Sequence, residues 1–436
     1  MTMYRSEQLK KLLSDRRILI AGYGREGQST HALMQQILPS QQVDIAHNDE
    51  EIVARLKVGD YDCVIKSPGI PNALFEGRCP MDRLTSLTDI FLQVYGDQTI
   101  GITGTKGKSS TTSLIHHVLS VQSDKLTPSR DSSNILLAGN IGIPLFDIIP
   151  QMDQRSIVVA ELSCHQLQNI HRAPHIAILL NLYQEHLDHY HDYRDYQLAK
   201  LNIALKQREG DCFLYCSDNE ELAARVEEFR QAMQGSVTPY CLAGYRDRVA
   251  DFVTSLKGDH NLSNIVVAML ACGHYGIGDA DFAAALASFK GLEHRMEFVA
   301  TKNDISFYND SISTIPEACE AAVEALGSVD TLILGGFDRG IDYSGLARYL
   351  AKCSVRNFVF VGQAGRRIFE AMKPLRSIGD AHLLQSDDYK AIVDWCYAHT
   401  LPGCICLLSP AAASYDAFKN FEHRGRTFKQ LVLDHQ

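Results

Sequence analysis

The chain has 436 residues, 45% of them hydrophobic and 22% charged, with a formal net charge of -10. This acidic balance argues against broad binding to nucleic acid or to an anionic membrane, and no apolar run approaches the ~20 residues of a membrane-spanning helix. At roughly 150 residues per domain, the length predicts about three domains. Residues 1–11 do not resemble an export signal, and the twelve cysteines lack metal-site spacing. We therefore expect a cytoplasmic protein with reduced thiols and no membrane insertion.

The first segment has the pattern of a Rossmann-like unit. A predicted strand at 17–21 runs into the turn Gly22-Tyr23-Gly24-Arg25-Glu26-Gly27, which is followed by a helix to about residue 38. Further strands are expected at 42–46 and 62–66, the latter followed by Ser67-Pro68-Gly69-Ile70. A G-x-G-x-x-G turn between strand and helix holds a diphosphate at the helix N-terminus. By itself the turn fits NAD as well as any other pyrophosphate ligand.

A second phosphate motif is stronger. The β-prone residues 98–100 lead to Gly104-Thr105-Lys106-Gly107-Lys108-Ser109-Ser110, and a helix-like run continues over 111–119. Glycine amides and the helix N-terminus can close on phosphate oxygens, while Lys108 and Ser109 can serve the terminal phosphates and Mg²⁺. Ile102 stands where the general G-x-x-x-x-G-K-[ST] pattern has its first glycine. The loop predicts a site for ATP or GTP.

Acidic and imidazole side chains follow the next predicted strands. Glu161 comes after a strand at 156–160, and His186 follows a strand at 175–182. Because ligands of open α/β sheets bind at the carboxyl ends of strands, both side chains are expected near the phosphate loop, with Glu161 as a Mg²⁺ ligand. Lys200 lies in a predicted helix and, taken alone, is an ordinary surface lysine.

The third segment starts near residue 296, with strands at 331–334, 357–361 and 405–408 that alternate with helical stretches. Repeated strand and helix alternation predicts an α/β protein with doubly wound, mostly parallel sheets. We expect three domains: a Rossmann-like domain over 1–96, a central P-loop ATPase-like domain over 97–296 and a Rossmann-like domain over 297–436.

The order of the motifs resembles the Mur ligase family over essentially the whole chain. The length suits the members that add glutamate to UDP-N-acetylmuramoyl-L-alanine better than their longer relatives. The residues that carry the resemblance are Gly104 to Ser109, Gly139-Asn140-Ile141-Gly142, Glu161-Leu162-Ser163, Asn181 to His186 with Asp188, Lys200, Gly258-Asp259-His260-Asn261 with Asn264, His294-Arg295, Asn309-Asp310-Ser311, and Leu408-Ser409-Pro410-Ala411 with Ser414.

The resemblance implies a monomeric ligase of peptidoglycan precursor synthesis that uses ATP and Mg²⁺ to join UDP-N-acetylmuramoyl-L-alanine and glutamate through an acyl phosphate. It implies catalytic roles for Lys108, His186 and Lys200, the last carboxylated so that it offers oxygen to Mg²⁺ together with Ser109, Glu161 and His186. The resemblance implies that the precursor is bound by Gly22, Tyr23, Gly24, Arg25, Ser67, Pro68, Gly69, Asn140 and Ser163. ATP binding falls to Gly104, Thr105, Lys106, Gly107, Lys108, Ser109, Ser110, Asn264, Arg295 and Asp310. Glutamate binding falls to Arg339, Ser414 and Phe421.

One departure bears on the handedness of the amino acid. D-glutamate ligases are expected to have lysine at Ile312 and asparagine at Ile315, so this chain lacks one cation near phosphate and glutamate. D-glutamate is our prediction, and addition of L-glutamate to the same precursor is the alternative. Among other classes, an NAD-dependent oxidoreductase leaves Lys108 and Ser109 unexplained. A nucleotide-binding switch without chemistry leaves Glu161, His186 and Lys200 unexplained together.

Overall fold

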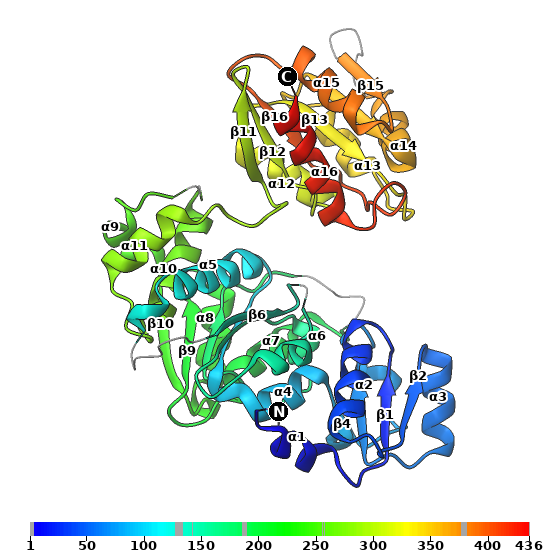
Figure 1. The fold of residues 1–436 in the computed structure, drawn as a ribbon, viewed down its shortest axis with the longest axis vertical. Coiled ribbons are helices and arrows are strands. Elements are labelled where there is room, and N and C mark those ends of the chain that lie inside the picture. The colour runs from blue at the N-terminus through cyan, green and yellow to red at the C-terminus, as the bar shows by residue number, and fades with distance from the viewer. Residues whose placement is uncertain are drawn as a thin grey trace. The chain divides into compact units, whose positions relative to one another are not determined.

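The structure is a computed structural model that describes residues 4–126, 134–141, 143–184, 190–254, 256, 258–375 and 382–435. The chain divides into two compact units, Met1–Phe289 and Lys290–Gln436 (Figure 1). The first unit contains two sheets and the second contains one. Every pairing between the described strands is parallel except that of β11 with β12, which confirms the prediction of mostly parallel α/β sheets. The three domain boundaries stay a prediction.

The first unit begins with a four-stranded sheet in the order β2-β1-β3-β4. Its strands are β1 (Ile18–Ala21), β2 (Val43–Ala46), β3 (Cys63–Lys66) and β4 (Leu84–Thr85). The helices of this segment are α1 (Ser6–Leu13), α2 (Arg25–Ile37), α3 (Asp49–Val58) and α4 (Leu87–Tyr95), with short 3₁₀ turns η1 (Asn72–Leu74), η2 (Met81–Arg83) and η3 (Gly96–Gln98). The central strands β1 and β3 are buried on both faces, as a parallel sheet covered by helices requires, whereas the edge strand β2 is only partly buried.

The larger sheet of the first unit has the order β10-β9-β8-β5-β7-β6. Its strands are β5 (Thr99–Thr103), β6 (Ile135–Gly139), β7 (Ile157–Glu161), β8 (Ile176–Leu179), β9 (Cys212–Cys216) and β10 (Ser236–Tyr240). Its helices are α5 (Lys108–Val121), α6 (Cys164–Leu167), α7 (Tyr193–Leu205), α8 (Glu220–Phe229), α9 (Leu242–Val249), α10 (Asp259–Gly273) and α11 (Asp279–Ser288), with η4 (Ser123–Lys125), η5 (Leu145–Gln151) and η6 (Arg230–Ala232).

Hydrophobic residues of this unit form three cores, two of which involve the larger sheet. One lies between the larger sheet and the helices α5, α10 and α11, and includes Ile102, Leu114 and Val267. The other is shared by both sheets and reaches from Met34 on α2 to Leu179 on β8. Because one continuous core serves both sheets, the two sheets belong to a single compact unit.

The second unit has a six-stranded sheet in the order β11-β12-β16-β13-β14-β15. Its strands are β11 (Glu297–Lys302), β12 (Ile305–Asn309), β13 (Val329–Gly335), β14 (Asn357–Val361), β15 (His382–Gln385) and β16 (Ile405–Leu408). Its helices are α12 (Pro316–Leu326), α13 (Ser344–Leu350), α14 (Gly362–Met372), α15 (Tyr389–His399) and α16 (Phe421–Asp434). One core packs α12, α13 and α14 on one face of the sheet, and a second packs α15 and α16 on the other. The layers are therefore helix, sheet and helix.

The predicted strands are present: β14 and β16 have the predicted bounds, and the ends of the others differ from the prediction by one to three residues. Strand β5 begins at Thr99 because Gln98 belongs to a 3₁₀ turn, and β8 ends at Leu179, three residues before the predicted end. Glu161 is the last residue of β7 and does not follow the strand as predicted, since it pairs in register with Ile102 and Gly139. All twelve cysteines are free thiols. No helix in the described part of the chain is both long and apolar enough to cross a bilayer.

Candidate functional site

The loop between β5 and α5 has the strand, turn and helix geometry predicted for phosphate binding. Gly104 and Gly107 have φ angles of 154° and 84°, which favour glycine. A Cβ atom on Gly107 would lie 2.9 Å from Oδ1 of Asn264, so only glycine lets the loop approach α10. Lys108 opens α5, and Ser109 and Ser110 follow in its first turn, where backbone N–H groups have no partner within the helix. The arrangement suits an anion at the N-terminus of α5.

Two lysines from different helices meet at the carbonyl of Gly104. Lys108 Nζ donates to this oxygen at 3.0 Å and to that of Thr105 at 2.9 Å, and Lys200 Nζ donates to the Gly104 oxygen at 2.8 Å. Lys200 is only 2% exposed, and its ammonium lies 4.9 Å from the ring centroid of Tyr196. Lys200 is therefore not the ordinary surface lysine that its helix alone suggested. The structure therefore brings two lysine side chains from different helices to the loop that is predicted to bind phosphate.

Thr105 joins the loop to the segment after β8. Its Oγ1 lies 2.8 Å from the hydroxyl of Tyr196 and accepts the N–H of Tyr183 at 2.9 Å. The N–H of Lys106 donates to Oδ1 of Asn181 at 2.8 Å. The segment that leads toward His186 is thus attached to the phosphate loop. His186 and Asp188 themselves lie outside the described residues.

Glu161 offers a buried oxygen for a cation. Its side chain is 2% exposed, and Oε1 accepts from Nδ2 of Asn140 at 2.7 Å. Oε2 is buried without a hydrogen-bond partner among the described residues. A buried carboxylate oxygen without a donor fits the hard oxygen donor that Mg²⁺ prefers. Within the described ranges no three His, Cys, Asp or Glu residues cluster to hold a metal, so Glu161 would need the phosphates, water or undescribed residues as co-ligands.

Two predicted precursor-binding residues adjoin Glu161 on neighbouring segments. Asn140 follows β6, where a Cβ on Gly139 would lie 2.2 Å from the Glu161 carbonyl oxygen, and its amide is engaged by Glu161. Ser163 caps α6, and its Oγ accepts the N–H of Gln166 at 3.2 Å in a capping box. Both residues lie at the carboxyl edge of the larger sheet.

The glycine turn after β1 is built as the Rossmann motif requires. Gly22 has a φ angle of 91°, and Ser67 Oγ donates to its carbonyl oxygen at 2.9 Å. A Cβ on Gly27 would lie 2.1 Å from that same oxygen, which explains the last glycine. Gly24 is the N-cap of α2, with no other atom within 4 Å of a Cβ placed on it. This open space at the helix N-terminus has room for a ligand.

The remaining residues predicted at this turn lie around it. Arg25 is exposed at the start of α2, and after β3 Pro68 is partly exposed and Gly69 is exposed. The Tyr23 hydroxyl lies 2.7 Å from Nδ1 of His31, and its ring meets that of His47 edge-on at 5.2 Å. A small aromatic and imidazole group therefore borders the turn.

Sequence analysis missed a polar link between this turn and α6. Gln166 Nε2 donates to Oε1 of Glu26 at 2.7 Å, and Lys66 Nζ donates to the carbonyl of Ile70 at 2.7 Å. Burial raises the pKa of Glu26 to about 7 and lowers the pKa of Lys66 to about 8. The residues are far apart in sequence, so no local pattern indicates the contact.

In the second unit, Asp310 accepts hydrogen bonds from its own loop and from two other segments of the chain. Ser409 Oγ donates to its carboxylate at 2.7 Å, Ser313 Oγ also donates, and the N–H of Met296 donates at 3.1 Å. Burial raises the pKa of Asp310 to about 6. Arg295 lies beside this loop and is partly exposed. The ribose contacts predicted for Arg295 and Asp310 stay a prediction.

The residues predicted to bind glutamate lie at the carboxyl edge of the sheet of the second unit. Arg339 is exposed in the turn after β13, Ser414 is 3% exposed in the loop after β16, and Phe421 begins α16. Phe337 N–H donates to the Ala413 carbonyl at 2.9 Å, so the β13 turn and the loop with Ser414 are neighbours. Ile312 and Ile315, which stand where lysine and asparagine were expected, both precede α12; Ile312 is partly buried and Ile315 is 47% exposed.

Sequence analysis also missed Arg424, which organises these loops. Its guanidinium is 1% exposed and donates to Ser311 Oγ at 2.9 Å, to Ser311 O at 2.8 Å, and to the carbonyls of Ala412 and Ala413 at 3.0 Å each. The arginine lies on the buried side of α16, four residues after the N-cap Asn420. The sequence signals no more than the place of Arg424 on a helix. Its hydrogen-bond partners lie more than ten and more than a hundred residues away in the chain.

Comparison with known proteins agrees with this geometry. Residues 102–272 match the Mur ligase middle domain. The UDP-N-acetylmuramoylalanine--D-glutamate ligase of Desulfitobacterium hafniense (strain DSM 10664 / DCB-2) is 33% identical over 400 residues, which cover 86% of this chain and 84% of the relative. The ligase of the same description from Desulfitobacterium hafniense (strain Y51) is 31% identical, covering 97% of this chain and 98% of the relative. The chain belongs to the Mur ligase family.

The fold is shared with solved structures at much lower sequence identity. A crystal structure of MurF from Acinetobacter baumannii superposes with a TM-score of 0.59 at 17% identity, covering 80% of each chain. MurC from Thermotoga maritima gives a TM-score of 0.55 at 16% identity, with 97% of this chain and 100% of the other covered. These similarities show the architecture alone.

Proposed function

We propose that this protein joins glutamate, with D-glutamate preferred, to UDP-N-acetylmuramoyl-L-alanine at the expense of ATP. The relatives with 31% and 33% identity over most of the chain are D-glutamate ligases by name. The observation that carries the proposal is the meeting of Lys108 and Lys200 at the Gly104 carbonyl. Neither a simple nucleotide switch nor an NAD-dependent oxidoreductase needs a second buried lysine at its phosphate loop.

The reaction follows from these groups. The alanyl carboxylate of the precursor attacks the γ-phosphorus of ATP, ADP leaves, and an acyl phosphate forms. The neutral amine of glutamate then attacks the acyl carbon, inorganic phosphate leaves from the tetrahedral intermediate, and the amine gives up a proton. Lys108 and the amides of the loop stabilise the charge on the transferred phosphoryl group. Holding the reactants in place removes part of the entropic barrier, up to about 7 to 11 kcal/mol.

The remaining roles are assigned as part of the proposal. Gly104 to Ser110 with Asn264, Arg295 and Asp310 bind ATP. The Gly22 to Arg25 turn, Ser67 to Gly69, Asn140 and Ser163 bind the precursor. Arg339, Ser414 and Phe421 bind glutamate. Mg²⁺ would be held by Ser109, Glu161, His186 and a carboxylated Lys200, and when bound it supplies charge neutralisation at the phosphates. In this proposal the protein is a cytoplasmic monomer with three domains and no nucleic-acid partner. Its reaction serves peptidoglycan synthesis and hence cell division.

A second candidate differs only in the handedness of the amino acid. Ile312 and Ile315 replace the lysine and asparagine expected in D-glutamate ligases, so the loop offers one cation fewer. Enantiomers share every functional group, and discrimination depends on at least three fixed contact points. The loss of one such point favours L-glutamate as the alternative substrate.

Phosphate release from ATP with the precursor and each glutamate enantiomer tests both candidates. We expect release only when precursor and glutamate are both present, with a higher kcat/KM for D-glutamate and a product whose mass has increased by one glutamyl residue. A higher kcat/KM for L-glutamate would reverse the assigned handedness. Inactivity with both enantiomers, in a protein that hydrolyses ATP with another amino acid, would refute the glutamate assignment.

A further inference from the structure

The turn that carries Arg339 is attached to helix α14. Oδ1 of the neighbouring Asp338 accepts the N–H of Gly340 at 2.9 Å and Nη1 of Arg367 at 2.6 Å. The Asp338 side chain is 10% exposed. An exposed ion pair contributes little, but here one largely buried oxygen both closes the turn and binds an arginine from another element. The orientation of the turn therefore depends on Arg367.

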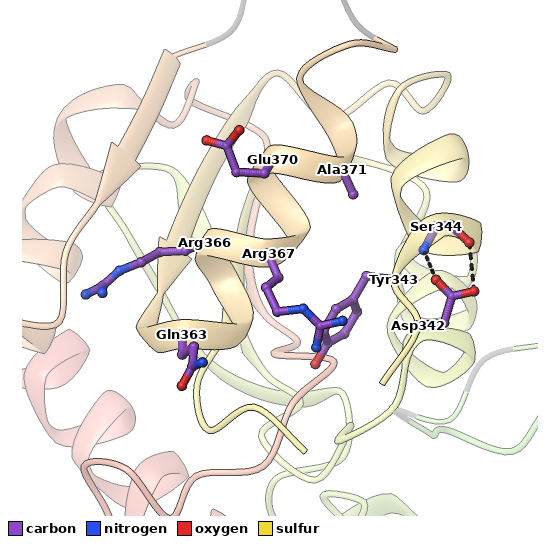
Figure 2. A pocket seen from close by; sticks show the side chains of 8 residues that line it. All are labelled: Asp342, Tyr343, Ser344, Gln363, Arg366, Arg367, Glu370 and Ala371. Carbon is purple, nitrogen blue, oxygen red and sulfur yellow. Dashed lines mark hydrogen bonds between the residues drawn. The ribbon is translucent and has the colours of Figure 1, made fainter. Parts of the chain in front are cut away.

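The Arg367 side chain is 43% exposed and lies over an aromatic ring. Its guanidinium carbon lies 5.4 Å from the ring centroid of Tyr343, which is 3% exposed and precedes α13. Figure 2 shows the guanidinium over this ring, at a groove of about 440 Å³ between α13 and α14. A buried ring under a planar cation restricts its conformations, so the donor that meets Asp338 is already oriented.

We infer that Arg367 is a positioning residue for the amino-acid substrate: through Asp338 it fixes the turn from which Arg339 reaches the carboxylate of glutamate. The inference rests on the proposed function, because the contact between Arg339 and glutamate belongs to that proposal. An arginine that binds a carboxylate bidentately needs a defined direction, and a turn free to move by about 1 Å loses much of that advantage.

The test compares Arg367→Met and Asp338→Asn, singly and combined, with two matched controls. Asparagine keeps an oxygen for the Gly340 N–H but removes the charge that faces Arg367. Arg366→Met removes the adjacent arginine of α14, which pairs with Asp387 at 3.3 Å and not with Asp338. Tyr343→Phe keeps the ring under Arg367 and removes only its hydroxyl. Trp395 fluorescence confirms that each variant is folded.

Two measurements are made on each variant. The first is KM for glutamate, beside KM for the precursor and for ATP. The second is the rate of tryptic cleavage after the exposed Arg339, which reports local opening of the turn without requiring catalysis.

We expect Arg367→Met and Asp338→Asn each to raise KM for glutamate about tenfold and the cleavage rate about fivefold, with no further increase in the double variant. The controls and the other KM values should stay within about twofold. Unchanged cleavage after Arg339 in folded Arg367→Met, or additive effects in the double variant, would overturn the inference. If the wild-type protein shows no glutamate-dependent activity, the proposed substrate is wrong, and so is the role of Arg367 in binding glutamate. Faster cleavage of the variants would then still show that Arg367 anchors the turn.

Discussion

Replacing Arg424 by methionine should destabilise the second unit specifically. The guanidinium is 1% exposed and makes four hydrogen bonds to the loops at Ser311 and Ala412 to Ala413. Methionine keeps most of the side-chain volume but has no donor. Each of the three backbone carbonyls and the Ser311 hydroxyl then loses the hydrogen bond from Arg424, although the Ala413 carbonyl keeps its bond from the Phe337 N–H and the Ser311 hydroxyl keeps its bond to the Phe421 carbonyl.

The magnitude follows from the contacts that are lost. At about 1 kcal/mol for each hydrogen bond, four bonds correspond to about 4 kcal/mol of free energy of unfolding. Removing the guanidinium also removes the cost of keeping its charge away from water, which offsets part of this loss. Burial already disfavours the charged form, because it lowers the pKa of Arg424. Arg424→Lys, which can keep one or two of the bonds, should lose about half as much, roughly 2 kcal/mol.

Urea unfolding followed by tryptophan fluorescence measures this effect in the right unit. Trp395 is the single tryptophan of the chain, and it lies on α15 in the second unit, stacked on His399 with ring centroids 4.1 Å apart. With a slope of about 2 kcal/mol per molar urea, a loss of about 4 kcal/mol lowers the midpoint by about 2 M.

Arg426→Met, two residues along the same helix and exposed, is the matched control and should shift the midpoint by less than about 0.3 M. A midpoint for Arg424→Met within that same range would refute the reasoning that these four hydrogen bonds hold the loops together. A loss as large in Arg426→Met would show that α16 tolerates no substitution and that the contacts of Arg424 are not special.

Three further predictions concern the first unit. Lys108→Met should abolish ATP binding, because the ammonium at the loop is lost, while calorimetry still detects the UDP precursor; loss of precursor binding in the folded variant would contradict separate sites. Lys200→Ala should be nearly inactive and be partly rescued by a short carboxylic acid, which supplies the missing oxygen ligand; rescue of phosphate release by an amine instead would exclude a carboxylated lysine. Glu26 has a folded pKa of about 7 against an ordinary value of 4.5, so the folded state holds its proton longer and the free energy of unfolding should fall as pH rises from about 4.5 to about 7. That pKa difference of about 2.5 corresponds to about 3 kcal/mol of free energy of unfolding at most. Urea titrations followed by circular dichroism should show a weaker dependence of this free energy on pH in Glu26→Gln. An unchanged pH dependence would assign it to another group.

Much of the local architecture could be predicted from the sequence. The phosphate loop, the glycine turn after β1 and the strands β14 and β16 are specified by neighbouring residues: glycines with positive φ, apolar runs, and helix starts directly after them. Such signals act within about ten residues, where backbone sterics and hydrogen-bonding capacity dictate the conformation.

The details of the site depended on tertiary packing. Lys200 is 96 residues from the Gly104 carbonyl that it contacts, and only the packing of α7 against the larger sheet buries it there. Sequence predicted Asn140 as a contact for the precursor, but the structure also places its amide on Glu161, since β6 and β7 are neighbours in the sheet. The burial of a side chain and its contacts with residues distant in sequence depend on the packed core. Burial and contacts in turn determine the charge, the pKa and the orientation of each functional group.

For the second unit the division is the same. The residues alone predict that Arg339 and Ser414 follow strand ends, and the structure adds that Phe421 begins α16. Only the folded chain decides that Arg424 joins the loop that contains Ser414 to the segment at Ser311, and that Arg367 contacts Asp338 beside Arg339. The physical reason is that a guanidinium can bind whichever acceptors the fold places within its reach, and the order of the strands, not the spacing of the residues, decides which acceptors those are.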